Sequence, residues 1–154
     1  MEAVIFVGIQ GAGKSTFYKE RFFKSHMHIN LDMVRTRKRE DIFLDACLRA
    51  KQPFVIDNTN PTVKDRNKYI ALSKEAGFKI IGYYFKTNIK DATIRNEVRI
   101  GKDKVPSFVI ASTFSKLVEP TYEEGFDKLY MVRIGEGNSF IIEEFQRYLE
   151  DFHY

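Results

Sequence analysis

"GIQGAGKS", residues 8–15, is the most informative stretch of this sequence. It follows the apolar run "AVIFV" (residues 3–7) and precedes "TFYKERFF" (residues 16–23), which is typical of a helix. The stretch fits the pattern G-x-x-x-x-G-K-[ST], in which glycines turn consecutive backbone N–H groups toward an anion and the next helix adds the positive end of its dipole. The pattern and its context predict a phosphate-binding loop. The alternative is a glycine-rich turn without a ligand.

The residues of this loop have expected roles in holding a nucleoside triphosphate. Lys14 is expected to reach the β- and γ-phosphates, and the Ser15 hydroxyl to bind Mg²⁺. The segment "KTNIKD" at residues 86–91 lacks the spacing of the N/T-K-x-D motif that recognises guanine, so ATP is the expected nucleotide. The nucleotide-binding residues expected in the loop are Gly8, Gly11, Ala12, Gly13, Lys14, Ser15 and Thr16.

Apolar runs alternate with helical patterns along the 154 residues, which by length form one domain. The runs are continuous rather than alternating in polarity, as in parallel strands that are buried on both faces. These patterns predict an α/β fold, with a five-stranded parallel sheet and helices on both of its faces. The expected strands are residues 3–7, 28–31, 54–56, 78–85 and 128–134, and the expected helices are residues 14–24, 33–51, 61–76, 89–100, 106–117 and 139–152. The last helix is expected because several apolar residues fall on one helical face, namely Ile141, Ile142, Phe145, Leu149 and Phe152.

The composition limits the classes of function. The net charge of +4 and a sequence pI near 9.1 permit an anionic partner. Cys47 is the single cysteine, no Cys/His spacing predicts zinc, and the three histidines form no catalytic pattern. The first apolar run is short, follows Glu2 and enters the glycine loop. We therefore expect neither a signal peptide nor a membrane span, and a cytoplasmic protein.

The stretch "HINLDMVR", residues 28–35, places Asp32 at the carboxyl end of the second expected strand. Ligands bind at this edge of parallel sheets, and phosphoryl transfer to an alcohol needs a carboxylate that accepts the hydroxyl proton. Asp32 is therefore a candidate general base, or else the N-cap of a helix that begins at Met33. Arg35 lies three residues on, where it can bind an acceptor phosphate or pair with Asp32. The basic run "RTRKR", residues 35–39, is either a solvated face or a contact for a nucleic-acid backbone.

Two further stretches carry candidate residues. "FVIDNTNP", residues 54–61, is an apolar strand that ends in Asp57, which predicts a magnesium-binding carboxylate or, alternatively, an Asx-turn. "IRNEVRIGKDKVP", residues 94–106, places Arg95 and Arg99 four residues apart on one helical face. Arginine pairs well with phosphate oxygens, so residues 89–117 are a candidate lid over the triphosphate. The alternative is that both cations complement a helix C-terminus.

Taken in order, six stretches resemble the kinase domain of polynucleotide 5′-hydroxyl kinases, of both the phage type and the animal DNA-repair type. The resemblance covers roughly residues 3–134, and its most specific parts are "IDNTNP" and "EPTYEEGF". It implies a P-loop kinase that transfers the γ-phosphate of ATP to the 5′-hydroxyl end of DNA or RNA. The six stretches are "GIQGAGKSTF", "HINLD", "VIDNTNP", "IRNEVR", "VP" and "EPTYEEGFDKLY".

The resemblance also implies roles for single residues. The loop lysine and serine of the family fall on Lys14 and Ser15, and the general base falls on Asp32. The arginine that binds the acceptor phosphate falls on Arg35, and the lid arginine on Arg99, with Arg95 as its neighbour. Asp57 matches the acidic residue after the third strand.

The chain also departs from the family. Leu31 stands where the family often has an arginine before the base, which leaves the choice of acceptor open. The sequence contains no D-x-D-G-T phosphatase motif, so we expect a kinase without phosphatase activity, and association with a separate ligase or phosphatase is left open. Two alternatives stand beside the polynucleotide kinase. One is a kinase for a small alcohol, a nucleoside or an aminoacyl-tRNA, and the other is a non-catalytic ATP-binding module of a repair complex.

Overall fold

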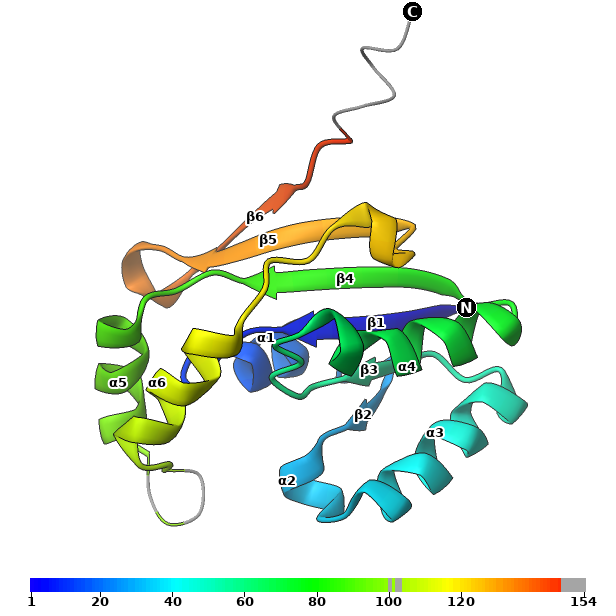
Figure 1. Ribbon diagram of the computed structural model, residues 1–154, viewed down its shortest axis with the longest axis horizontal. Helices are drawn as coiled ribbons and strands as arrows, with labels where there is room; N and C mark the ends of the chain where they lie inside the picture. The colour runs from blue at the N-terminus through cyan, green and yellow to red at the C-terminus, as the bar shows by residue number, and fades with distance from the viewer. Residues whose placement is uncertain (100, 102–103, 148–154) are drawn as a thin grey trace, which may run out of the picture.

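The computed structural model describes residues 1–99, 101 and 104–147, and within them a six-stranded sheet forms the centre of the molecule (Figure 1). The strand order is β2-β3-β1-β4-β5-β6, and each neighbouring pair from β2 to β5 is parallel. The strands are β1 (Glu2–Val7), β2 (Met27–Ile29), β3 (Phe54–Ile56), β4 (Lys79–Phe85), β5 (Lys128–Ile134) and β6 (Phe140–Glu144). The helices are α1 (Lys14–Arg21), α2 (Leu31–Val34), α3 (Arg37–Ala50), α4 (Val63–Glu75), α5 (Ile89–Glu97) and α6 (Ser107–Lys116). The segments η2 (Tyr122–Glu124) and η3 (Glu136–Asn138) are short 3₁₀ helices.

Strand β1 is the centre of the core because its residues alternate between two apolar clusters. Ala3, Ile5 and Val7 pack with residues of α3 and α4 on one face of the sheet. Val4 and Phe6 pack on the other face with residues of α1, α5 and α6. Such two-sided burial explains why the strand is a continuous apolar run in the sequence. The α/β fold and the five parallel strands predicted from the sequence are confirmed.

The prediction of a helix over residues 139–152 is wrong in its described part, because residues 140–144 form β6, antiparallel to β5. Gly137 (φ 64°) and Asn138 (φ 59°) adopt left-handed conformations in the tight connection, which lets the chain reverse. Phe140 then packs edge-to-face on Phe17 of α1, with ring centroids 5.1 Å apart. The sheet therefore has six strands rather than five, and residues 148–152 of the predicted helix lie outside the described residues.

The helix predicted over residues 33–51 is two helices. Asn30 caps α2 by accepting hydrogen bonds from the backbone N–H groups of Asp32 and Met33. The helix ends at Val34, because the next residue, Arg35, has a φ of 79°. Thr36 then caps α3 by accepting from the Arg39 N–H. Asp32 is thus not the N-cap. Arg35 lies beyond the end of the short helix rather than on one helical face with Asp32.

The segment predicted to form a lid, residues 89–117, contains α5 and α6, which pack against each other beside the carboxyl end of β1 (Figure 1). Its connection is held by the buried Asn96, whose amide group bonds both the N–H and the carbonyl of Val105, at 2.9 and 2.6 Å. Residues 100, 102 and 103 of the predicted lid lie outside the described residues. Arg95 lies on α5, whereas Arg99 lies beyond the end of that helix.

Candidate active site

The phosphate-binding loop follows β1 and contains two glycines in left-handed conformations, Gly11 (φ 81°) and Gly13 (φ 95°). A Cβ atom at Gly11 would lie 2.5 Å from the carbonyl oxygen of Ala92 in α5, so only glycine allows this contact between loop and lid. A Cβ atom at Gly13 would lie 3.0 Å from Ile134 and 3.2 Å from Phe140 of the β5–β6 hairpin. The loop is thus held between the lid and that hairpin.

The Lys14 side chain is buried and turns back onto the loop. Its Nζ donates to the carbonyl oxygens of Gly8 and Ile9, at 3.0 and 2.9 Å. Burial, with a smaller effect of the Arg99 charge, lowers the pKa of Lys14 to about 8. The carboxylates of Asp57 and Asp32 act in the opposite direction. The lysine, Arg99 and the two aspartates are therefore close enough to influence one another.

Asp57 follows β3 directly, and its buried carboxylate connects three elements. Its Oδ2 accepts from the Ser15 hydroxyl at 3.0 Å and pairs with His28 Nε2 at 2.7 Å. Burial by itself would raise the pKa of the Asp57 carboxyl, but the hydrogen bond from His28, the charge of Lys14 and the bond from Ser15 bring this pKa below its ordinary value. The carboxylate is therefore ionised at neutral pH.

The Asp57 and Ser15 pair fits a magnesium ion. Asp57 Oδ1 is buried and has no hydrogen-bond partner among the described residues, which leaves one carboxylate oxygen beside the loop for a ligand. Carboxylate, hydroxyl and water oxygens are the donors that Mg²⁺ prefers. No cluster of three or more His, Cys, Asp or Glu side chains suited to a metal occurs in the described residues.

His28 is a site residue that the sequence reasoning missed. It lies on β2 next to β3, and its ring stacks on Tyr18 of α1 with centroids 3.9 Å apart. The contact with Asp57 follows from the parallel pairing of β2 and β3, which brings the ends of both strands together. The sequence did contain a signal for this residue: His28 lies in the expected strand that ends just before the candidate Asp32.

Asp32 lies in the first turn of α2, at the carboxyl end of β2. The cap residue Asn30 also donates from Nδ2 to the Asp57 carbonyl oxygen, at 2.9 Å. Asn58 accepts from the Leu31 N–H at the same distance, 2.9 Å. These two bonds tie the start of α2 to the loop after β3. The exposed Asp32 side chain is thereby held at one edge of the site.

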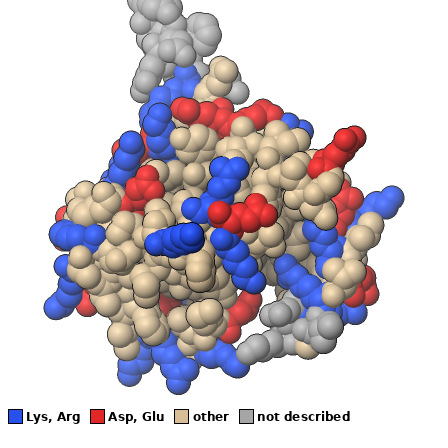
Figure 2. All heavy atoms as spheres, turned by 180° about the vertical axis from the view of Figure 1, so that it is seen from behind, with Lys and Arg blue, Asp and Glu red and all other residues tan. Residues whose placement is uncertain are grey.

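A cavity of about 400 Å³ brings five of the predicted site residues together. Lys14, Ser15, Asp32, Asp57 and Arg99 all line it, together with Arg37 of α3 and Lys116 of α6, which the sequence reasoning did not single out. Gln10 Nε2 donates to Thr113 Oγ1 of α6 at 3.1 Å, so the loop and the lid meet across this cavity. Figure 2 shows an opening on this side, with Lys and Arg side chains along the lower edge of the molecule, over α2 and the start of α3.

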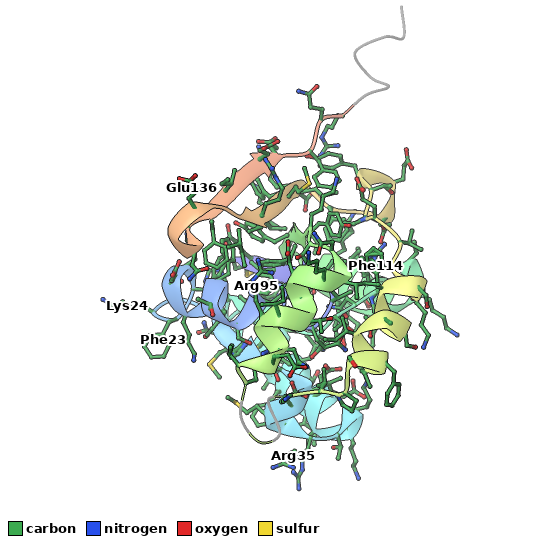
Figure 3. The ribbon with its side chains drawn as sticks, turned by 90° about the vertical axis from the view of Figure 1, so that its left-hand side faces the viewer. Phe23, Lys24, Arg35, Arg95, Phe114 and Glu136 are labelled. Carbon is green, nitrogen blue, oxygen red and sulfur yellow. The ribbon has the colours of Figure 1, made fainter. Side chains whose placement is uncertain are left out.

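Arg35 and Arg95 lie elsewhere. Arg35 is exposed, and it is not one of the described residues that line the cavity. Figure 3 shows its side chain pointing away from the body of the molecule. Arg95 donates to the Gly11 carbonyl oxygen at 3.2 Å and to Thr87 Oγ1 at 3.3 Å. It lines a second pocket of about 310 Å³ on the other side of the loop, together with Ala12, Lys86, Thr87, Asn88, Asp91, Arg133 and Ile134. Arg99 and Arg95 therefore line two different pockets beside the loop.

Known proteins resemble this chain in sequence and in fold. A family model described as "AAA domain" matches residues 4–120. A bifunctional polynucleotide phosphatase/kinase of Schizosaccharomyces pombe is 28% identical over 129 residues, which cover 81% of this chain and 32% of that protein. A putative bifunctional polynucleotide phosphatase/kinase of Acanthamoeba polyphaga mimivirus is 32% identical over 138 residues, covering 85% of this chain and 33% of that protein. This chain thus spans about a third of the length of these relatives.

The fold likeness extends to solved structures. A gluconokinase from Sinorhizobium meliloti 1021 is similar over 88% of this chain and 83% of its own, with a TM-score of 0.61 and 16% identity. None of the described helices has the length and apolar composition needed to cross a bilayer. The resemblance drawn from the motifs is confirmed: the chain belongs to the AAA domain family, as a P-loop protein whose relatives include polynucleotide phosphatase/kinases.

Proposed function

We propose that this chain is an ATP-dependent kinase that transfers the γ-phosphoryl group of ATP to the 5′-hydroxyl end of DNA or RNA. The observation that carries the proposal is the convergence of Lys14, Asp32 and Arg99 on one cavity beside the phosphate-binding loop. A module that only bound ATP would need no carboxylate on the acceptor side of the triphosphate. The names of the two curated relatives support nucleic acid as the acceptor.

In this proposal the loop residues bind the triphosphate. The backbone N–H groups of residues 8–16 surround the β- and γ-phosphates, and Lys14 exchanges its bonds to the Gly8 and Ile9 carbonyls for phosphate oxygens. Ser15 and Asp57 would hold Mg²⁺, which supplies positive charge against the phosphate oxygens when it is bound. The pocket beside Arg95 and Arg133 accepts the nucleoside end of ATP.

Asp32 acts on the acceptor. Its carboxylate accepts a hydrogen bond from the 5′-hydroxyl group, orients the oxygen in line with the γ-phosphorus, and takes the proton as the new P–O bond forms. Arg99 offsets the negative charge on the phosphoryl group during transfer. ADP leaves with the electron pair of the broken P–O bond. Asp32 and Arg99 line the same cavity as Lys14.

The test is a transfer assay with γ-labelled ATP and Mg²⁺. The acceptors are a 5′-hydroxyl DNA oligonucleotide, the RNA oligonucleotide of the same sequence, a nucleoside, and a mixture of small alcohols. We expect label in the oligonucleotides. Label only in the small alcohols would instead identify a small-molecule kinase, and binding of ATP without transfer to any acceptor would indicate a non-catalytic module.

The substitution Asp32→Asn tests the base. We expect the rate of transfer to fall by about 10²- to 10⁴-fold because the amide cannot take the proton, with ATP affinity nearly unchanged. Asp45→Asn is the matched control, since Asp45 is an exposed carboxylate on α3 that pairs with Arg49. An equal loss of ATP binding and transfer in Asp32→Asn would mean that Asp32 has a structural role.

A further inference from the structure

His28 contacts the candidate site, yet the transfer mechanism described above gives it no role. Its Nε2 lies 2.7 Å from Asp57 Oδ2, and the two side chains are 18% and 1% exposed. The Asp57 carboxylate is ionised and can only accept a hydrogen bond, so His28 Nε2 is the donor. This bond is largely shielded from water and fixes one oxygen of the carboxylate.

Tyr18 of α1 fixes the plane of the His28 ring. The two rings are nearly parallel, with an interplanar angle of 12° and centroids 3.9 Å apart. The Tyr18 hydroxyl donates to the His26 carbonyl oxygen at 2.5 Å, which attaches the far end of the tyrosine to the chain just before β2. The His28 ring therefore cannot turn away from Asp57 without losing its stacking contact with Tyr18.

These contacts form a closed ring of four side chains from three parts of the fold. Ser15 and Tyr18 lie three residues apart on α1, so they share one face of that helix. Ser15 Oγ donates to Asp57 Oδ2 at 3.0 Å, and His28 on β2 donates to the same oxygen. The ring closes where His28 stacks on Tyr18. Each side chain is thereby held in one orientation.

This orientation leaves two kinds of oxygen for a cation. Asp57 Oδ2 accepts both hydrogen bonds, and Oδ1 is buried without a hydrogen-bond partner among the described residues. The Ser15 hydroxyl has one proton, and because that proton points to Asp57, the lone pairs of its oxygen are available to a ligand. Both residues line the cavity beside the phosphate-binding loop. Without His28, the carboxylate would be free to turn and the Ser15 proton would lose its fixed acceptor.

We propose that His28, held by Tyr18, is a positioning residue that keeps Asp57 and Ser15 oriented for the Mg²⁺ ion that accompanies the nucleotide. This inference rests on the proposed function, which assigns Mg²⁺ to Asp57 and Ser15, but it requires only the binding of nucleotide and metal. Within the described part of the chain, His28 does not line the cavity. It acts through Asp57, so its loss should weaken the response to Mg²⁺ rather than the affinity for nucleotide alone.

The test is a titration of the full chain with a fluorescent, non-hydrolysable ATP analogue, once in excess Mg²⁺ and once in EDTA. We expect Mg²⁺ to tighten binding to the wild type. In His28→Leu this tightening should be reduced by about 10-fold, since the loss of a residue that orients a metal ligand costs about 10- to 100-fold in metal affinity. The affinity in EDTA should change little.

Two variants serve as controls. His28→Gln keeps an N–H donor for Asp57 and should retain most of the tightening by Mg²⁺. His26→Leu removes a nearby histidine that contacts Glu2 instead, so its tightening should equal that of the wild type. If His28→Leu fails to fold, Tyr18→Leu carries the test, because it removes the stacking contact and keeps the donor. It should reduce the tightening by a smaller factor.

Three results overturn the inference. One is an equal loss of affinity in Mg²⁺ and in EDTA, which a merely structural role of His28 would produce. The second is unchanged tightening in His28→Leu, or in Tyr18→Leu where that variant replaces it. The third is wild-type binding that does not respond to Mg²⁺. A wild-type chain that binds the analogue with Mg²⁺ but labels no acceptor in the transfer assay overturns the proposed kinase function instead.

Discussion

The pKa of Lys14 lies well below the ordinary value for a lysine. Its ammonium group is buried, and the charge of Arg99 acts on it in the same direction as burial, so its pKa falls to about 8. Two backbone carbonyls and two carboxylates only partly compensate. An arriving triphosphate would supply the missing negative charge, and Lys14 is therefore poised for an anion rather than for a structural ion pair.

The lowered pKa of Lys14 predicts how stability depends on pH. The unfolded chain keeps this proton up to the ordinary pKa of 10.5, whereas the folded chain loses it near pH 8. The unfolded state therefore binds more protons between these values, and the contribution of Lys14 to the free energy of unfolding rises with pH, by about 1.4 kcal/mol per pH unit at most.

Urea denaturation of the nucleotide-free protein between pH 8 and 9.5 measures this effect. The variant Lys14→Met lacks the titrating group, so the stability of the wild type relative to Lys14→Met should rise across that range. Restricting the range avoids the tyrosines: burial, with added effects of neighbouring groups, raises the pKa of Tyr83 to about 12, and such groups lower stability as the pH passes 10. A difference that is flat with pH would show that the folded Lys14 keeps its ordinary pKa.

Among the elements, the parallel strands were predictable and the edge strand was not. Strands β1, β3 and β4 are continuous apolar runs, and each precedes a loop or helix with recognisable turn or cap residues. Residues 140–145 contain apolar residues at positions that fit either a helix or a strand, and the reversal at Gly137 and Asn138 decided between them. The break at Arg35 was also hidden, because a positive φ at an arginine has no signature in the sequence.

The same division applies to the candidate site. Asp32 and Asp57 were found because each follows an expected strand, and the ends of parallel strands meet at one edge. Arg37 was not distinguished from the rest of the basic run because its contact with Tyr69 comes from another helix, α4. His28 was missed because its partner, Asp57, follows another strand. Sequence patterns predict helices and strands. The contacts of Arg37 with Tyr69 and of His28 with Asp57 depend on how those elements pack in the folded chain.

The contact between the loop and α5 predicts an effect of Gly11→Ala. Gly11 has a positive φ, and a Cβ atom there would lie 2.5 Å from the Ala92 carbonyl oxygen, so α5 must shift. We expect a loss of stability of about 1–3 kcal/mol and weaker nucleotide binding, measured by denaturation and by titration with an ATP analogue. Gly137→Ala is the control, since Gly137 also has a positive φ but has open space at its Cβ. Equal effects of the two variants would mean that the close approach contributes nothing.

Across the whole molecule, Arg66 joins segments that are far apart in the sequence. This fully buried residue of α4 makes two hydrogen bonds to Glu124 of η2, at 2.7 and 2.9 Å. Its Nη1 donates to the carbonyl oxygens of Asn60 and Val118, both at 3.0 Å. The segment after the lid helix α6 is thereby attached to the loop after β3, which contributes to the site.

Removing the charge of Glu124 should therefore destabilise the entire fold. Breaking a buried pair leaves an uncompensated charge on Arg66, so Glu124→Gln should lower the free energy of unfolding by about 3–5 kcal/mol. Glu123→Gln is the matched control at the next position, where the exposed side chain should change stability by less than about 0.5 kcal/mol. Chemical denaturation of both variants provides the measurement, and equal midpoints would contradict the prediction.

The packing of Phe140 against Phe17 and close to Gly13 has a consequence for the order of events during synthesis. The phosphate-binding loop is complete in the sequence by residue 16, yet its support comes from a hairpin more than a hundred residues later. A nascent chain that has emerged only as far as β4 has the loop without that support. We therefore expect the nascent chain to bind ATP only after the β5–β6 hairpin has left the ribosome. Nucleotide binding would then follow the completion of the sheet.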